Sequence, residues 1–172
     1  MMKDIVVLDN CIDTGPLLDL AERVQFYDMD KHPREVQAAW KGQRTVSLFN
    51  DHNEFITDQI SQILVNTMTD YKDCANRFDI NWQGDAYFHK LRAKDKLDTS
   101  DIHIDRHFVY AAVLYLTKDA PEDAGTIIWK NDTAHRIENK FNRLVLYRAD
   151  YLHSPMASFD TRLTMVMFFR MM

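Results

Sequence analysis

The sequence has few of the residues that mark linkers, low-complexity segments or disulfide frameworks. Its 172 residues include only 4 glycines, 4 prolines and 2 cysteines. Cys11 and Cys74 lie far apart and belong to no pattern, which favours reduced thiols over a disulfide scaffold. The chain shows neither an internal repeat nor a biased segment. We therefore expect a single domain over residues 1–172, in a cytoplasmic protein.

The sequence also lacks an excess of basic residues and a long apolar run. Its formal net charge is -5, whereas proteins that neutralise nucleic-acid phosphates usually carry a surplus of lysine and arginine. The apolar run from Ile5 to Leu8 is too short for a signal peptide or a membrane span. We expect neither a nucleic acid nor a membrane as partner, and no feature points to an oligomeric state. With 46% hydrophobic residues, the chain can bury a core without disulfides.

The apolar pattern changes in character along the chain. Residues 1–78 mix predicted strands at 5–8 and 45–49 with predicted helices at 17–26 and 53–77. Residues 79–172 contain short segments rich in Val, Ile, Tyr and Phe, which predict strands at 85–91, 102–105, 109–117, 126–130, 143–148 and 162–170. Evenly spaced strands without helices between them indicate a sandwich or barrel. The pattern predicts an α+β fold in which N-terminal helices pack on one sheet of a β-rich core.

Three side chains in the second half are candidate metal ligands. His103 and Asp105 form an H-x-D tripeptide, and residues two apart in an extended strand point to the same side. His153 follows the strand predicted at 143–148 and is a candidate third ligand. Two histidines and one carboxylate on one face of a metal form the facial triad of non-haem Fe(II) oxygenases. The tripeptide alone is also compatible with a solvated His–Asp pair.

An arginine follows the last candidate ligand by nine residues. Arg162 opens the final strand, and Thr164 shares its face of that strand. A guanidinium binds a carboxylate through two hydrogen bonds, and burying it in an apolar strand is costly without an anion. These two side chains are candidates for binding an anionic cosubstrate. The alternative is that Arg162 lies at the strand mouth with its charge in water, and that Thr164 merely fills the strand.

Taken together, these motifs resemble the 2-oxoglutarate/Fe(II) dioxygenase superfamily, and within it the prolyl-hydroxylase-like branch. The resemblance covers about Tyr87 to Phe169 and consists of an ordered series of segments. These are HisIleAsp at 103–105, AlaAlaValLeuTyrLeuThr at 111–117, AlaGlyThr at 124–126, AsnLysPheAsnArgLeuValLeuTyr at 139–147, His153, and ThrArgLeuThrMetValMetPhePhe at 161–169. Ala124-Gly125 replaces a glycine pair that is frequent in the family, and residues 92–102 differ from its usual approach to the H-x-D.

The resemblance implies a double-stranded β-helix, or jelly roll, over 79–172, supported by 1–78. It implies His103, Asp105 and His153 as iron ligands, and Arg162, Tyr115 and Thr164 as residues that bind 2-oxoglutarate. The implied cofactors are Fe(II), 2-oxoglutarate and O2, with ascorbate as a further candidate. The implied reaction is hydroxylation of a C–H bond in an amino acid, peptide or small molecule, with release of succinate and CO2.

Two alternatives stay open at this point. The chain is compatible with a jelly-roll module that binds a metal without turnover, and with a cupin-like metal enzyme. Two other histidines are less informative than the candidate ligands. His89 is predicted on a strand surface, with a position in the cavity lining as the alternative, and His107 toward solvent or the cavity entrance.

Overall fold

We analysed a computed structural model, which describes residues 5–34, 40–68, 82–97, 101–156 and 160–171. The first part of the chain contains β1 (Ile5–Asp9), α1 (Gly15–Arg23), β2 (Tyr27–Asp28), a 3-10 turn η1 (Met29–Lys31), β3 (Gln43–Arg44) and α2 (Asn53–Met68). The second part contains β4 (Trp82–Leu91), β5 (Tyr110–Tyr115), β6 (Thr126–Lys130), β7 (Thr133–Ile137), β8 (Arg143–Arg148), β9 (Leu152–Pro155) and β10 (Arg162–Met171).

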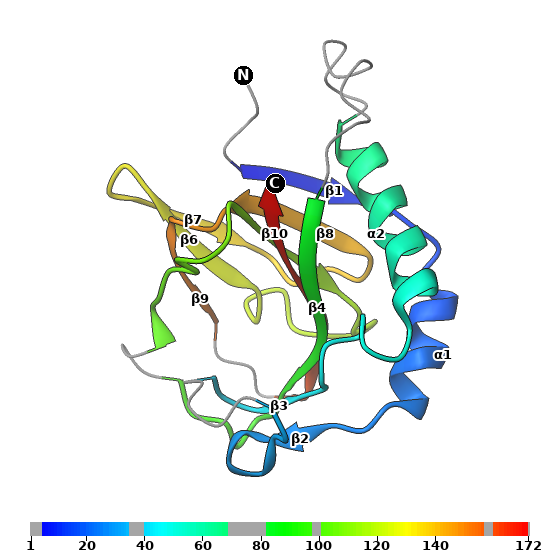
Figure 1. Ribbon diagram of the computed structural model, residues 1–172. Coiled ribbons are helices and arrows are strands. Elements are labelled where there is room, and N and C mark those ends of the chain that lie inside the picture. The colour runs from blue at the N-terminus through cyan, green and yellow to red at the C-terminus, as the bar shows by residue number, and fades with distance from the viewer. Residues whose placement is uncertain (1–4, 35–39, 69–81, 98–100, 157–159, 172) are drawn as a thin grey trace.

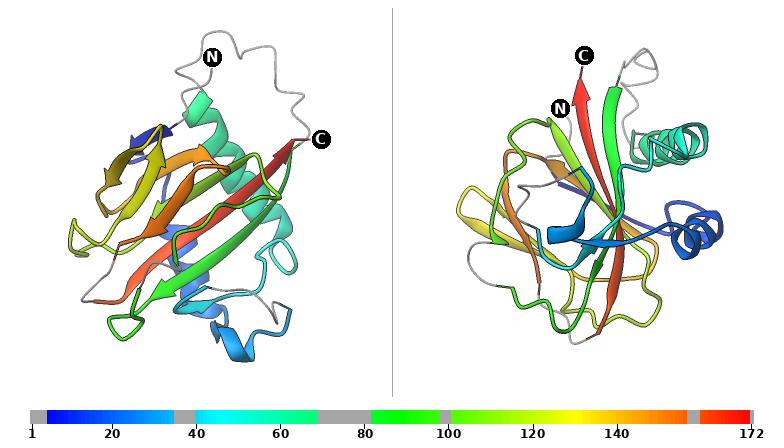
Figure 2. Two further views of the ribbon diagram at one scale, coloured as in Figure 1. Left: turned by 90° about the vertical axis from the view of Figure 1, so that its left-hand side faces the viewer. Right: turned by 60° about the horizontal axis from the view of Figure 1, so that its bottom comes forward.

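The strands form two antiparallel sheets, one large and one small. The large sheet has the order β1-β8-β5-β10-β4-β3-β2, and the small sheet has the order β7-β6-β9. An isolated bridge between His103 and His153 adds one more pairing to the free edge of β9. The two helices cover one side of the large sheet, and the small sheet lies on its other side (Figure 1, Figure 2). The predicted jelly roll with helices packed on one sheet is confirmed.

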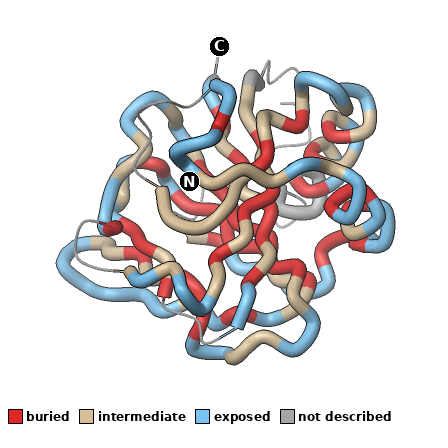
Figure 3. The backbone as a smooth tube through the Cα atoms, turned by 90° about the horizontal axis from the view of Figure 1, so that it is seen from below, coloured by how far each residue is buried: buried red, intermediate tan, exposed pale blue. Residues whose placement is uncertain are grey.

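The helices dock through apolar residues spaced by about one turn. Leu17, Leu20 and Ala21 of α1 are buried, as are Ile56, Ile60 and Ile63 of α2, because residues three and four apart share one helix face. They join the side chains on the helix-facing side of the large sheet in one core, which includes Phe88, Leu114, Leu144, Met165 and Met167. Figure 3 shows the buried positions gathered along the central strands.

The opposite side of the large sheet supplies a second, smaller core. Ala111, Val113 and Tyr115 alternate with helix-facing residues along β5, since successive side chains of a strand point to opposite faces. They pack with Val145 and Tyr147 of β8 and with Ile128 of the small sheet. This inner space between the two sheets contains the candidate site.

Several sequence-based boundaries were wrong. The strand predicted at 45–49 is absent. The paired residues are Gln43 and Arg44, after which the amides of Thr45 and Leu48 each donate a single hydrogen bond to a β4 carbonyl. The segment 102–105 forms one bridge instead of a strand.

The two-residue strand β2 was not predicted, and neither were two strands in the second part of the chain. β7 (ThrAlaHisArgIle) has four exposed residues in five, and β9 contains Pro155, so neither shows a clear apolar alternation. The helix predicted to residue 77 is described to Met68, and the rest of that prediction lies outside the described residues. Among the residues described, no helix has the length and apolarity that a membrane span needs.

Candidate metal and cosubstrate site

The structure brings His103, Asp105 and His153 together, with one potential ligand atom from each lying within 4.8 Å of the others. Asp105 Oδ2 lies 3.3 Å from His153 Nε2, and Asp105 Oδ1 lies 3.8 Å from His103 Nε2. His153 is held by β9, and His103 by its bridge to His153. Asp105 is fixed because its amide donates a 2.8 Å hydrogen bond to the Ala149 carbonyl. Backbone pairing thus positions all three side chains.

Both imidazoles are oriented by their second ring nitrogen. His103 Nδ1 lies 2.8 Å from the Asp101 carbonyl oxygen, and His153 Nδ1 lies 2.9 Å from the Tyr151 carbonyl oxygen. A carbonyl only accepts, so each Nδ1 carries the proton and donates. Each Nε2 therefore presents a lone pair toward Asp105. Metal-bound histidines are oriented in this way by a hydrogen bond from the other ring nitrogen.

The carboxylate of Asp105 completes a set that fits a divalent cation. Asp105 Oδ2 is buried and has no hydrogen-bond partner among the described residues. A buried, unpaired carboxylate oxygen is costly unless a cation compensates it. Two imidazole lone pairs and one carboxylate match the ligand types of a non-haem iron site. The His153 side chain is 7% exposed and that of His103 is 51% exposed, so the triad opens to solvent on the His103 side.

A cavity of about 270 Å³ extends from the triad between the two sheets. The wall on the large sheet consists of rows of paired residues from neighbouring strands. Their side chains point away from the helices. Tyr147, Ala111 and Phe168 pair across β8, β5 and β10 and form the row beside the triad. Val113 and Val166 form an apolar middle row. The far end is polar and is lined by Thr126, Thr164 and Arg162.

Arg162 is the most unusual group at the far end. It is 3% exposed, and its Nη1 donates to the carbonyls of Ala124 and Gly125. Its Nε is buried without a partner, and no carboxylate of the described residues forms an ion pair with it. Burial lowers the pKa of Arg162 from its ordinary value, because a charged guanidinium loses its hydration there. A buried cation with free donor capacity is suited to an anionic ligand.

Tyr115 and Thr164, the two other residues predicted to bind 2-oxoglutarate, lie near Arg162. The two residues are register partners across β5 and β10. Tyr115 is fully buried, and its hydroxyl donates a 2.7 Å hydrogen bond to Thr126 Oγ1. Burial raises the pKa of Tyr115. Thr126 and Thr164 line the cavity, so Tyr115 reaches its wall through Thr126.

Comparisons with known proteins place this arrangement in a known fold. No protein-family profile matches the sequence, and no curated protein sequence matches it. Solved structures do match. A prolyl-4-hydroxylase from Pseudomonas putida has a TM-score of 0.65 at 14% identity, with 97% of this chain and 92% of that chain covered. The protein HygX from Streptomyces hygroscopicus, with nickel and 2-oxoglutarate bound, has a TM-score of 0.65 at 12% identity, with 98% and 83% covered.

A third structure is a prolyl hydroxylase from Trichoplax adhaerens in complex with a peptide fragment of the hypoxia inducible factor. It has a TM-score of 0.63 at 10% identity, and 96% of this chain and 83% of that chain are covered. The chain has the fold of the 2-oxoglutarate/Fe(II) oxygenases. Prolyl hydroxylases are among its structural neighbours, in agreement with the branch that the motifs resemble.

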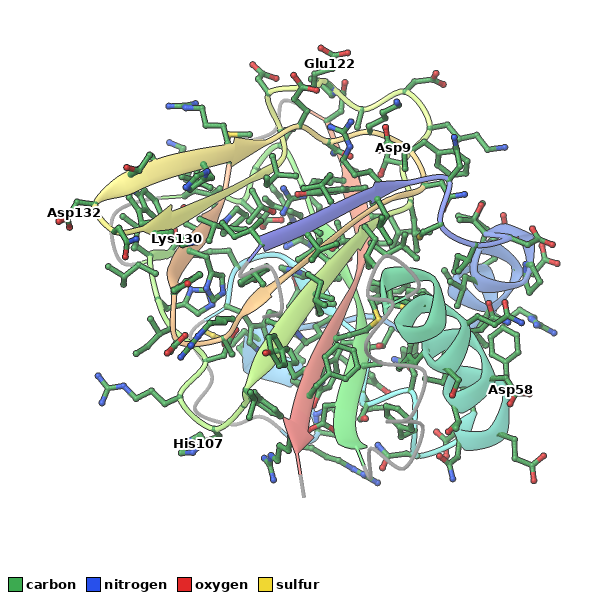
Figure 4. The ribbon with its side chains drawn as sticks, turned by 90° about the horizontal axis from the view of Figure 1, so that it is seen from above. Asp9, Asp58, His107, Glu122, Lys130 and Asp132 are labelled. Atoms are coloured by element: carbon green, nitrogen blue, oxygen red, sulfur yellow. The ribbon has the colours of Figure 1, made fainter. Side chains whose placement is uncertain are left out.

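Sequence reasoning misplaced or missed three residues of this oxygenase fold. His89 is not on a strand surface but is buried and lines the cavity as the register partner of Thr164. Its Nε2 donates to the Lys41 carbonyl, and burial together with Arg44 lowers its pKa to about 3, so it is neutral. Thr126 and Tyr147 were not singled out, because each lies in a strand pattern typical of core residues. His107 is exposed and points away from the sheets (Figure 4).

Proposed function

We propose that this chain is an Fe(II)- and 2-oxoglutarate-dependent dioxygenase that hydroxylates a C–H bond of its substrate and releases succinate and CO2. One observation carries the proposal. A set of metal-ligand atoms lies at one end of a cavity whose other end holds a buried arginine without a carboxylate partner among the described residues. The fold neighbours support it, since HygX carries nickel and 2-oxoglutarate.

His103, Asp105 and His153 would hold the metal. Each imidazole offers the Nε2 lone pair that its Nδ1 hydrogen bond leaves free, and Asp105 offers its unpartnered oxygen. When bound, Fe(II) together with 2-oxoglutarate and O2 supplies the oxidising chemistry. The protein's own part is to orient these ligands and to keep bulk water from the cavity.

The cavity matches the chemistry of 2-oxoglutarate along its length. This cosubstrate has a carboxylate at each end and methylene groups between them. The cavity is polar at both ends, and Val113 and Val166 form its middle. Arg162 would bind the distal carboxylate through its unpartnered Nε, and the Thr126 hydroxyl, which accepts from Tyr115, would add a donor. The Thr164 hydroxyl would add a second donor by leaving its 3.4 Å hydrogen bond to the His89 carbonyl. Tyr115 would position Thr126 through the hydrogen bond between them.

The substrate would approach on the side of the triad where His103 is half exposed. The substrate classes to consider are an amino acid, a peptide and a small molecule. The Trichoplax neighbour, which binds a peptide, favours a peptide as the first substrate class to test.

Succinate formation tests the proposal directly. The purified chain is supplied with Fe(II), 2-oxoglutarate and air, and succinate is measured with and without candidate peptides. We expect Asp105→Ala to lower turnover more than about 100-fold, because loss of a ligand exceeds the 10–100-fold effect of losing an outer partner. Asp150→Ala is the control, since Asp150 is an exposed carboxylate paired with Arg148. Equal succinate formation by the wild type and Asp105→Ala would reject the triad. A tightly bound zinc ion without any response to 2-oxoglutarate would favour a cupin-like metal protein.

A further inference from the structure

The hydroxyl of Tyr147 is a polar group on the cavity wall that the proposed function does not use. Tyr147 is 3% exposed and lines the cavity. No described residue forms a hydrogen bond with its hydroxyl, whereas the hydroxyl of Tyr115 is bonded to Thr126. The hydroxyl of a largely buried tyrosine usually has a hydrogen-bond partner, and this one faces a cavity that a ligand can enter.

Tyr147 lies at the triad end of the cavity. Its ring contacts His153 edge-on, with the ring centroids 4.9 Å apart. Its register partner on β5 is Ala111, a small residue that leaves space in front of the phenol. Tyr115 comes four residues after Ala111 on β5, which is roughly 14 Å along an extended strand. The two tyrosines therefore lie far apart between the sheets, and Tyr147 is the one of the two that lines the cavity.

We propose that the Tyr147 hydroxyl donates a hydrogen bond to the carboxylate at the metal-binding end of 2-oxoglutarate. The inference rests on the proposed function and adds a binding residue to it. The phenol is a donor at neutral pH, because tyrosine ionises near pH 10. The carboxylate of Asp105 faces the two Nε2 atoms and makes no hydrogen bond with Tyr147. The acceptor therefore comes from a ligand, and the metal-end carboxylate is the anionic group of the cosubstrate nearest to this wall.

Binding of 2-oxoglutarate to Tyr147→Phe tests the inference. The protein is loaded with Ni(II), which accepts the same octahedral ligand set, and the Kd for 2-oxoglutarate is measured by calorimetry without O2. We expect about a tenfold or larger increase in Kd, since hydrogen bonds to charged groups contribute about 1.5–3 kcal/mol. The affinity for Ni(II) alone stays within about twofold, because phenylalanine keeps the ring contact with His153. Tyr110→Phe is the matched control on the neighbouring strand, since Tyr110 packs on the helix-side core.

A spectroscopic measurement locates the hydrogen bond at the metal end. The visible charge-transfer absorption of the anaerobic Fe(II) complex with 2-oxoglutarate depends on groups that touch the metal-bound carboxylate. We expect its maximum to shift in Tyr147→Phe and to stay in place in Tyr110→Phe. An unchanged Kd, an unchanged absorption maximum, or an equal loss of Ni(II) affinity would each overturn the assignment to Tyr147. A wild-type protein that binds the metal but no 2-oxoglutarate would instead reject the proposed function, and the inference with it.

Discussion

Replacing Arg162 by methionine separates a structural role from a ligand-binding role. Arg162 is a buried cation whose Nε has no hydrogen-bond partner among the described residues. The carbonyls that accept from it have other donors, since Asn139 Nδ2 donates to Ala124 and the Met156 amide donates to Gly125. Both carbonyls therefore keep a hydrogen-bond donor when the arginine is removed. Methionine fills a similar volume without a charge. We therefore expect Arg162→Met to be at least as stable as the wild type when no cosubstrate is present.

The magnitude follows from the burial of the charge. Removing an unsatisfied buried donor relieves a cost of about 1–3 kcal/mol. For a chain of this length, 1 kcal/mol corresponds to about 2–4 °C in Tm. Added 2-oxoglutarate at 100 times its Kd stabilises the metal-loaded wild type by about 2.7 kcal/mol, or about 5–10 °C. Loss of the arginine–carboxylate pair weakens binding more than about 100-fold, which leaves about 0.4 kcal/mol, or about 1 °C, at the same concentration.

Differential scanning calorimetry of the Ni(II)-loaded proteins, with and without 2-oxoglutarate, measures both effects. Arg143→Met is the control, because Arg143 is paired with Asp9 at 2.6 Å and Glu138 at 3.2 Å on the same sheet. This control should lose stability and keep the response to 2-oxoglutarate. A Tm of Arg162→Met that is several degrees below the wild type without ligand would refute the proposed role of Arg162. A rise in its Tm with 2-oxoglutarate equal to that of the wild type would also refute it.

Two further predictions concern stability and pH. His89 is neutral when folded because its pKa is lowered from 6.5 to about 3, so the unfolded chain takes up a proton first as the pH falls, and stability is lost below about pH 6.5. Between pH 8 and pH 5 this loss is about 2 kcal/mol; urea unfolding should show it in the wild type and not in His89→Gln, and equal pH profiles would contradict it. The pKa of Asp9 is lowered far below 3.8 by hydrogen bonds from Arg143 and Lys140, so its contribution is present above the ordinary pKa and is lost at lower pH. Asp9→Asn should therefore be less stable by about 1 kcal/mol at pH 7, with a difference that shrinks as the pH falls further below 3.8, and a constant difference would exclude the ion pairs as its cause.

The residues of the candidate site could be predicted because their spacing along the sequence is informative without knowledge of the fold. His103 and Asp105 are two apart, and Arg162 and Thr164 are two apart, which places each pair on one side of an extended segment. The convergence of His103 with His153 depends on a single bridge between segments 50 residues apart in sequence. Only the resemblance to a known family supplied that long-range pairing before the structure did.

Other features depend on neighbours that the sequence does not reveal. His89 lies between Phe88 and Lys90 in β4. Its burial in the cavity wall depends on Trp40 and Arg44, which come from a distant segment and lie beside it. Tyr147 lies in an apolar strand, so the sequence alone could not distinguish a tyrosine that lines a cavity from a tyrosine in the core. The contribution of Gly125 was also hidden. Its carbonyl accepts from Arg162, and a side chain there would overlap the Ile137 carbonyl, so the turn helps to hold the arginine.

A crystal structure of the chain grown without O2 in the presence of Fe(II) and 2-oxoglutarate tests the central claim most directly. We predict iron bound to Nε2 of His103, Nε2 of His153 and a carboxylate oxygen of Asp105, with the distal carboxylate of 2-oxoglutarate on Arg162. Iron density away from these three side chains, or a cosubstrate carboxylate that does not contact Arg162, would contradict the account.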